Sequence, residues 1–468
     1  MNYNVLYIIL SFFLFSGFSY VISWFFSRDY MGTKPKFLLA DRKLGLTESS
    51  FSIAASWIWA PSLFVSALQA YVYGWVGLFW FCVPNLFALI LFALLVNKIV
   101  NKFPQGYTLS EYMGNVYSFR VQSLYWVGLI GLTLGAFATQ ILAGSKFISM
   151  VSDINYFWAS VFLTLIPISY SIYFGLKSSV VTDYTKIILL YVVGIVMIPL
   201  TVFYAGGFDV LGKGVNGVTK AYTSLTDQNG WTVFATFGLP TAIGLLSGPF
   251  GDQAFWQRAF SIDKEYRQKS FLFAACLFII VPLSMGLLGF AAAGMEFIPK
   301  VKQFVNFELV SAMLGTFGII LFSVIVISSI TSILDSKLCA VSSISGHDIA
   351  SKFNIDSLLT GKVSMIILAS VAFLIANIPG IELIHLFLIY GALRSSTLLP
   401  TIMTMLCKNK LSERGVFYGI LLSMLLGIPV FAYGLLNNIL PITLIGSIGG
   451  VLLPGISILF FNTLEKYK

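Results

Sequence analysis

Apolar segments of about twenty residues recur along this chain from end to end, separated by short polar connections. A helix that crosses a bilayer needs roughly 20 mainly apolar residues, so each segment is long enough for one crossing. Only 10% of the residues are charged, against about 25% in an ordinary soluble protein. The pattern predicts an all-α polytopic membrane protein with about 13 transmembrane helices. They are expected roughly at residues 4–26, 47–73, 76–100, 121–150, 156–175, 181–206, 232–250, 269–294, 309–343, 361–378, 383–406, 413–436 and 440–463.

Two further segments need an interpretation. The first apolar run has no basic residues before it and no small-x-small cleavage site, so it is expected to be a retained span and not a signal peptide. The connection at 207–230 is rich in Gly, Asp, Asn and Thr and is expected to be a surface loop.

Lysine and arginine set the orientation, because they concentrate in cytoplasmic connections. With the N-terminus outside, the inner connections hold about four times as many of these residues as the outer ones. The outer ones hold only Lys146, Lys213, Lys220, Lys300 and Lys302. This topology explains the net charge of +9, and no basic run or aromatic-basic patch indicates a nucleic-acid partner. We therefore expect a multi-pass protein of the cell (plasma or inner) membrane with a cytoplasmic C-terminus.

Enzymatic chemistry is not expected. The four cysteines are scattered without metal-ligand spacing, and there are only two histidines. We find no nucleophile–base pair, metal cluster or phosphate-binding loop in the sequence.

Two expected helices are interrupted. The second carries SWIWAPS (56–62), and the seventh carries GLLSGPFGDQ (244–253). Proline inside a helix removes a hydrogen bond and clashes with the preceding turn. The breaks lie five helices apart, an odd number, so the chain meets them in opposite membrane directions. Paired broken helices in inverted halves indicate the binding site of a secondary transporter. Two ordinary proline kinks are the alternative.

Four motifs carry a family likeness: FLLADRKLG (37–45), VTDY (181–184), DQAFWQR (252–258) and ISSITSILDS (327–336). With them the chain resembles the sodium/solute symporter family over nearly its whole length, and SWIWAPSL and GDQAFWQRA look nearest the urea/polyamine-type branch. The resemblance implies the LeuT fold, with ten core helices in two inverted five-helix repeats. The expected divisions are an N-terminal extra helix and cytoplasmic loop (1–46), the first repeat (47–206), the second repeat (207–408) and two C-terminal extra helices (409–468).

The resemblance implies a first sodium site between the break in core helix one and the serines of core helix eight. Its ligands would be the carbonyls of Ala54, Trp57 and Ile325 and the hydroxyls of Ser328 and Ser329. From spacing alone, residues 325, 328 and 329 share one helix face. Sodium takes oxygen ligands, by the logic that holds for other hard cations. Hydrogen bonding between helices is the alternative role for the serines.

A second sodium site, present in some members of the family, would use an acid on core helix five. Its implied ligands here are Asp183, Ser328, Thr331 and Ser332. A carboxylate inside a membrane helix is costly and therefore a functional candidate. The alternative is a salt bridge in which Lys186, one turn away, neutralises Asp183.

The substrate is expected between the two breaks. Candidate contacts are Ser56, Trp59, Pro61, Ser62, Phe79, Asn85, Thr139, Gln140, Leu245, Ser247, Gly248, Asp252 and Arg394. Pro61 and Leu245 stand where sugar-binding members of the family have polar side chains, which disfavours a hexose. Core helix three has no arginine, which disfavours sialic acid. Trp57 and Trp59 could pack or gate without touching substrate.

Arg394 lies near the middle of core helix ten. An arginine there is costly unless it faces water or a partner. It could pair with a substrate carboxylate, or form a gate through a salt bridge to Asp252 or Glu382.

Together these features predict sodium-coupled symport of a small organic solute into the cell by alternating access, by a monomer in the lipid bilayer. The ions would be one or two Na+, with two preferred. The alternatives are a proton-coupled carrier on the same fold and a transporter-like membrane sensor. The sequence ends at Lys468, soon after the last expected span, so a sensor with a fused output module is not expected.

Overall fold

The computed structural model describes residues 17–152, 154–407 and 411–466, and these residues are mainly helical. Residues 17–27 are helical, whereas the start of the first expected span lies outside the described residues. In chain order the further elements are η1 (Arg28–Tyr30), α2 (Lys34–Leu39), η2 (Ala40–Arg42), α3 (Leu46–Trp57), α4 (Ala60–Val100), α5 (Leu109–Val116), α6 (Phe119–Val151), α7 (Tyr156–Ala205), α8 (Gly207–Gly214), α9 (Gln228–Val233), η3 (Phe234–Gly238), α10 (Leu239–Leu246), α11 (Gln253–Ser261), α12 (Arg267–Gly294), η4 (Lys302–Phe304), α13 (Val305–Ser343), η5 (Ile344–Ile349), α14 (Ala350–Phe353), α15 (Ser357–Ala376), α16 (Leu383–Leu406), α17 (Glu413–Leu422), η6 (Ser423–Gly427), α18 (Ile428–Leu436) and α19 (Leu440–Lys466).

Nine helical segments in the described part of the chain are long and apolar enough to cross a bilayer. The prediction of an all-α polytopic membrane protein is confirmed, but the count of thirteen is not. The helix α7 contains the expected spans 156–175 and 181–206, and α4 contains 76–100 and the second half of 47–73.

A glycine marks the join in each case. Gly74 in α4 has φ 58° and Gly175 in α7 has φ 62°, a left-handed conformation that favours glycine. A Cβ at Gly74 would lie 2.4 Å from the carbonyl oxygen of Val215, and one at Gly175 would lie 2.2 Å from that of Phe37. Both joins are therefore bends at which another segment of backbone packs against the glycine.

The connection at 207–230 is more ordered than expected from its composition. It contains α8 and the first residues of α9, and α8 packs against α12. Residues 215–218 then reach α4, because Val218 donates its amide hydrogen to the carbonyl of Tyr71 at 2.8 Å. The prediction of a plain surface loop is wrong for the part that forms α8.

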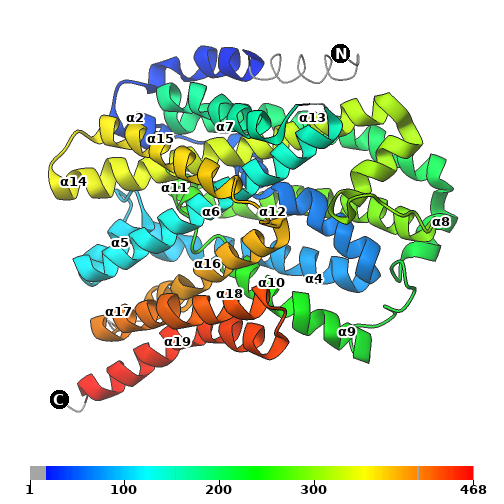
Figure 1. Ribbon diagram of the computed structural model, residues 1–468. Helices are drawn as coiled ribbons and strands as arrows, with labels where there is room; N and C mark the ends of the chain where they lie inside the picture. Colours follow the sequence, from blue (N-terminus) through cyan, green and yellow to red (C-terminus); the bar gives the residue numbers. More distant parts are fainter. Residues whose placement is uncertain (1–16, 153, 408–410, 467–468) are drawn as a thin grey trace.

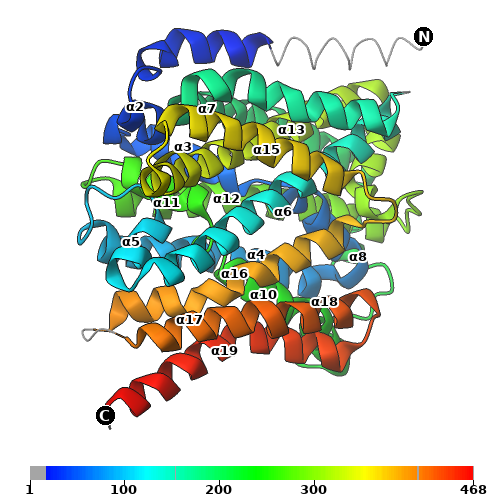
Figure 2. The same ribbon diagram turned by 60° about the vertical axis from the view of Figure 1, so that its left-hand side comes forward.

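Both views place the N-terminal helix, residues 17–27, on one flank of the protein, and α17, α18 and α19 on the opposite flank (Figures 1 and 2). Between these flanks lie α3, α4, α10, α11 and α12. α7 packs against α13 and α4 packs against α12. The broken helices are thus enclosed on both sides by other helices.

Candidate ion and substrate site

The first break separates α3 from α4. α3 ends at Trp57, Ile58 and Trp59 are extended, and Pro61 lies in the first turn of α4, where its missing N–H is not needed. Backbone groups released at the break find side-chain partners: Gln140 Oε1 accepts from the amide of Ala60 at 2.9 Å, and the Ser62 hydroxyl donates to the carbonyl of Trp57 at 3.3 Å. The helix is interrupted at SWIWAPS, where the sequence predicted it.

The second break separates α10 from α11. α10 ends at Leu246, residues 247–251 form turns, and Asp252 caps α11 by accepting from the amide of Ala254 at 3.0 Å. A Cβ on Gly248 would lie 2.3 Å from the ring of Trp57. The two breaks therefore touch, and glycine at 248 allows the contact.

α13 reaches the first break through its serines. The Ser329 hydroxyl donates to the carbonyl of Ile58 at 2.7 Å. The Ser328 hydroxyl is buried and has no hydrogen-bond partner among the described residues. Ile58 was not among the expected sodium ligands, yet its carbonyl is the one at the break that α13 contacts. The carbonyls of Ala54 and Trp57 each accept a hydrogen bond within the break.

A cavity of about 10 Å³ lies against these serines. Its walls are Ala55, Ile58, Lys186, Ile187, Leu190, Ser328, Ser329 and Ser332. A cavity of this size is near the lower limit for one water molecule. Ile325 is buried on α13, but it is not among the residues of this cavity.

Asp183 is fully buried and already has a cation beside it. Its Oδ2 accepts from Arg258 Nη2 at 3.1 Å and from the Ser52 hydroxyl at 2.7 Å. Its Oδ1 accepts from the Ser332 hydroxyl. The Thr331 hydroxyl instead donates to the carbonyl of Ile327 at 2.7 Å, within α13. The structure therefore joins Asp183 and Ser332, whereas Thr331 is bonded along its own helix.

Lys186 pairs with Asp335, at 2.7 Å from Nζ to Oδ2, and not with Asp183. The same carboxylate accepts from the hydroxyls of Tyr170 and Ser179, each at 2.7 Å. The alternative in which Lys186 neutralises Asp183 is wrong, because Arg258 does so. A buried ion pair needs such additional hydrogen bonds to offset desolvation.

Asp252 forms a salt bridge with Lys337. The predicted gate, a salt bridge from Arg394 to Asp252 or Glu382, is therefore not formed. Glu382 has a side chain that is 64% exposed, and its ionic neighbour is His385, at 4.0 Å. The Arg394 guanidinium lies against aromatic rings, with its Cζ 5.6 Å from the ring centroid of Trp57, 5.2 Å from that of Trp59 and 4.9 Å from that of Tyr390.

The remaining substrate candidates divide into two groups. The hydroxyls of Ser56, Thr139 and Ser247 donate to carbonyls four residues earlier in their own helices. Asn85 donates to the carbonyl of Phe81 in the same way. Phe79 packs against Trp80, and Pro61 and Leu245 are buried. Trp59, Gln140 and Arg394 are the candidates with an unpartnered N–H at the break, in the part of the chain that the structure describes.

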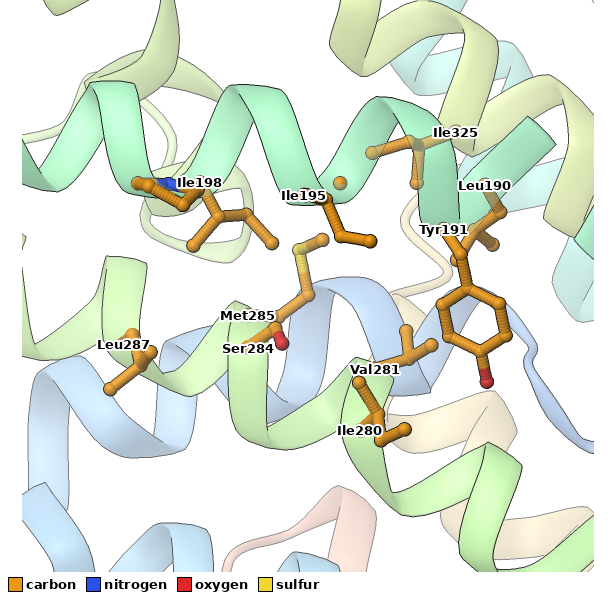
Figure 3. A pocket seen from close by; sticks show the side chains of 12 residues that line it. Leu190, Tyr191, Ile195, Ile198, Ile280, Val281, Ser284, Met285, Leu287 and Ile325 are labelled. Atoms are coloured by element: carbon orange, nitrogen blue, oxygen red, sulfur yellow. The ribbon is translucent and has the colours of Figure 1, made fainter. Parts of the chain in front are cut away.

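A larger pocket, of about 260 Å³, lies between α7 and α12 (Figure 3). Figure 3 shows aliphatic side chains such as Ile195, Ile198 and Ile280 around it. Ile195 is 73% exposed, so this pocket opens on the apolar outer surface. It is distinct from the two breaks and offers few polar atoms to an ion or a polar solute.

Comparison with known families agrees with the fold. The model of the Sodium:solute symporter family matches residues 37–423. Two solved structures cover nearly all of this chain. One is a Na+-coupled sialic acid symporter in a substrate-bound outward-open state (TM-score 0.74, 16% identity, 97% of this chain and 98% of that one). The other is a nucleobase-cation-symport-1 family transporter in a closed conformation (TM-score 0.59, 13% identity, 91% of this chain and 94% of that one). The expectation of a LeuT fold is confirmed.

Curated relatives include several named for urea. The chain is 23% identical over 401 residues to a probable urea active transporter of Schizosaccharomyces pombe (78% of this chain, 59% of that protein). It is 22% identical over 432 residues to the urea-proton symporter DUR3 of Oryza sativa subsp. japonica, a match that covers 83% of this chain and 59% of that protein. It is 23% identical over 415 residues to the urea active transporter of Saccharomyces cerevisiae, a match that covers 81% of this chain and 56% of that protein. The chain spans somewhat less than three-fifths of the length of these relatives.

Proposed function

Because the chain belongs to the sodium:solute symporter family, we propose that it carries a small organic solute into the cell together with sodium, by alternating access. The observation that carries the proposal is the contact between α13 and the first break. There the Ser329 hydroxyl bonds to the Ile58 carbonyl, beside a buried Ser328 hydroxyl that has no partner among the described residues. Leaving a buried hydroxyl without a partner costs about 1–3 kcal/mol, and a bound cation would remove that cost.

The proposed sodium ion lies between the Ile58 carbonyl and the hydroxyls of Ser328, Ser329 and Ser332. Oxygen ligands suit a hard cation, and an unwound helix supplies carbonyls at membrane depth. An ion in this place ties the first break to α13. Binding of sodium would therefore favour one arrangement of these two elements, and its release would free them to move.

We propose one sodium at this first site. A second ion at Asp183 is disfavoured because Arg258 already supplies a positive charge to that carboxylate. A second sodium would have to displace the guanidinium from a fully buried pair, which costs several kcal/mol unless Arg258 finds another partner.

The proposed orientation has the N-terminus outside and the C-terminus in the cytoplasm, in the cell membrane, with the protein acting as a monomer. The arrangement of lysine and arginine supports this orientation. The two inverted repeats would span 47–206 and 207–408. The membrane potential then contributes about 2.3 kcal/mol per charge per 100 mV to inward movement of sodium.

Proton coupling is the second candidate, and the position of Lys186 favours it. This buried lysine lines the same small cavity as Ser328 and Ser329. Its ammonium group would be a fixed positive charge in that cavity and would oppose binding of sodium there. The carrier would then use protons in place of sodium.

Sodium binding to the purified protein, followed by solute uptake under a pH gradient, separates the two candidates. In a scintillation proximity assay with 22Na+, we expect saturable binding that Ser328→Ala and Ser329→Ala each weaken about tenfold, the effect of losing one oxygen ligand worth 1–3 kcal/mol. Ser323→Ala is the matched control, because Ser323 lies on the same helix but bonds only to the carbonyl of Ile319. Absence of saturable 22Na+ binding, with solute uptake driven by a pH gradient, would reject sodium coupling.

A further inference from the structure

The strongest unexplained feature is the environment of Arg394 in α16. The residue is 2% exposed, in the middle of a membrane-spanning helix. The other buried cations near the breaks each have a carboxylate: Arg258 has Asp183, Lys186 has Asp335 and Lys337 has Asp252. Arg394 forms no salt bridge with any described residue. A buried charge without a partner is strongly destabilising, so this arrangement needs a reason.

Polar hydrogens without acceptors gather around the same guanidinium. Arg394 Nε, Trp57 Nε1 and Trp59 Nε1 are buried without a hydrogen-bond partner among the described residues. The tryptophan rings are the ones that Arg394 lies against, and they stack on each other at 5.6 Å between centroids. Tyr390, the third ring, has a buried hydroxyl beside the guanidinium of Arg394.

Gln140 adds a further donor beside Trp59. Its Oε1 accepts from the amide of Ala60, which fixes the orientation of the side-chain amide. The NH2 group is therefore the end that is buried and unpartnered. Apart from the tyrosine hydroxyl, which can also accept, the free groups of this cluster are hydrogen-bond donors.

We propose that Arg394, Trp57, Trp59, Gln140 and Tyr390 form the substrate site and that the substrate is a small monocarboxylate. This inference rests on the proposed transport function and names the class of solute. A planar guanidinium matches a carboxylate through two parallel hydrogen bonds, and the indole and amide hydrogens suit its remaining lone pairs. A neutral amide such as urea has four N–H groups that need acceptors, and this cluster offers few.

The aromatic rings define the rest of the ligand. Phe387 and Tyr390 meet the ring of Trp59 edge-on, with centroids 5.2 Å and 5.9 Å away. These apolar faces suit a short hydrocarbon tail. The close packing of Gly248 against Trp57 and Arg394 keeps the site narrow, because a Cβ there would lie 3.0 Å from Arg394 Nη1.

The test compares acids with their own amides. The probes are acetate, propionate, pyruvate and lactate, the amide of each, and urea, added to the protein in lipid nanodiscs with sodium present. Thermal shift and isothermal calorimetry give the affinities. We expect at least one acid to bind about tenfold or more tightly than its amide, because hydrogen bonds to a charged carboxylate are stronger than those to a neutral amide. Binding of urea or an amide as tight as that of the acids, or failure of all four acids to bind, overturns the proposal.

Two substitutions test whether Arg394 causes the preference for an acid over its amide. Arg394→Gln is expected to reduce the acid-to-amide ratio to near one, and Arg394→Lys to leave an intermediate ratio, because lysine keeps the charge but not the planar fork. Ser395→Ala is the matched control on the same helix, since its hydroxyl bonds to the carbonyl of Ala392. An unchanged ratio in well-folded Arg394→Gln would also overturn the proposal.

The outcomes separate this inference from the proposed coupling. If an acid binds but a sodium gradient does not drive its uptake into liposomes, sodium coupling is wrong and the carboxylate site stands. If a sodium gradient drives urea uptake and no acid binds, the carboxylate site is wrong and the coupling stands.

Discussion

The guanidinium of Arg258 lies 3.1 Å from the carboxylate of Asp183, and both side chains are fully buried. The acid that the family resemblance implied as a sodium ligand therefore has a resident cation. Arg258 also donates to the hydroxyls of Ser52 at 2.9 Å and Ser336 at 2.7 Å. This pair, with its two serine partners, joins α11 to α3, α7 and α13.

Removing the charge of Asp183 tests whether the pair is structural. Asp183→Asn leaves Arg258 buried without a carboxylate, which is expected to cost about 3–5 kcal/mol of stability. The apparent melting temperature should fall markedly. The double change Asp183→Asn with Arg258→Met should recover most of the loss, because the unpaired charge is gone.

A second sodium at Asp183 predicts a different outcome. Asp183→Asn would then express and melt near normally, while the Hill coefficient for sodium falls from near 2 towards 1. Measuring both the melting curve and 22Na+ cooperativity in the same preparations decides between the two roles.

Lys186 is expected to set the affinity of the neighbouring cavity for cations. Lys186→Met with Asp335→Asn removes both charges of the pair and keeps similar volume. Sodium should then bind more tightly, on the order of tenfold or about 1.4 kcal/mol, because Lys186 lines the cavity and Asp335 does not, so the lost repulsion exceeds the lost attraction. The measurement is 22Na+ binding. A double variant that binds sodium less well would instead make the pair part of the ion site.

The helix breaks could be predicted from the sequence because their signal is local. A proline or a cluster of glycines inside an apolar run needs no knowledge of the rest of the fold. SWIWAPS and GLLSGPFGDQ are therefore found in the structure as interruptions between α3 and α4 and between α10 and α11.

The partners of the buried charges could not be predicted, because they come from distant parts of the chain. Arg258 lies 75 residues from Asp183, Asp335 lies 149 from Lys186, and Lys337 lies 85 from Asp252. Helical spacing favoured Lys186 as the partner of Asp183, since the two are one turn apart. Arg258 lies in the motif DQAFWQR and Asp335 in ISSITSILDS. Charged residues in these motifs were therefore the available signal in the sequence for the buried ion pairs.

The bends at Gly74 and Gly175 coincide with boundaries between expected spans, at 73–76 and 175–181, and the backbone leaves helical φ/ψ at both glycines. The two glycines are expected to be intolerant of substitution. Gly175→Ala should lower the apparent melting temperature more than Gly315→Ala does. All three positions have positive φ, but a Cβ meets backbone at 175 and nothing within 4 Å at 315.

The expected fall in melting temperature follows from two costs, the backbone strain at positive φ and the steric clash of the new Cβ. Gly315 has φ 57° and ψ −142°, a region occupied almost only by glycine, so an alanine there costs roughly 1–3 kcal/mol, which should be the whole effect at that position. The 2.2 Å approach to the Phe37 carbonyl adds a steric cost at Gly175. Equal melting temperatures for the two variants would show that α2 moves away from α7 without cost.

The last prediction concerns Asp348 in η5, directly after α13, which ties this segment to the start of α5. Its carboxylate accepts from the hydroxyls of Thr108 at 2.8 Å and Ser110 at 2.5 Å and from Trp126 Nε1 at 3.0 Å. Asp348→Ala leaves these donors buried without their acceptor. Each lost bond to a charged group is worth about 1.5–3 kcal/mol, so a large fall in melting temperature is expected.

Asp356→Ala is the matched control on a nearby element. The carboxylate of Asp356 accepts from the amide of Leu359, at 2.5 Å, as the N-cap of α15, and losing such a cap costs about 1 kcal/mol. Asp348→Ala should therefore destabilise the protein more than Asp356→Ala, measured by intrinsic tryptophan fluorescence on heating. If the two variants melt together, Asp348 does not hold α13 to α5.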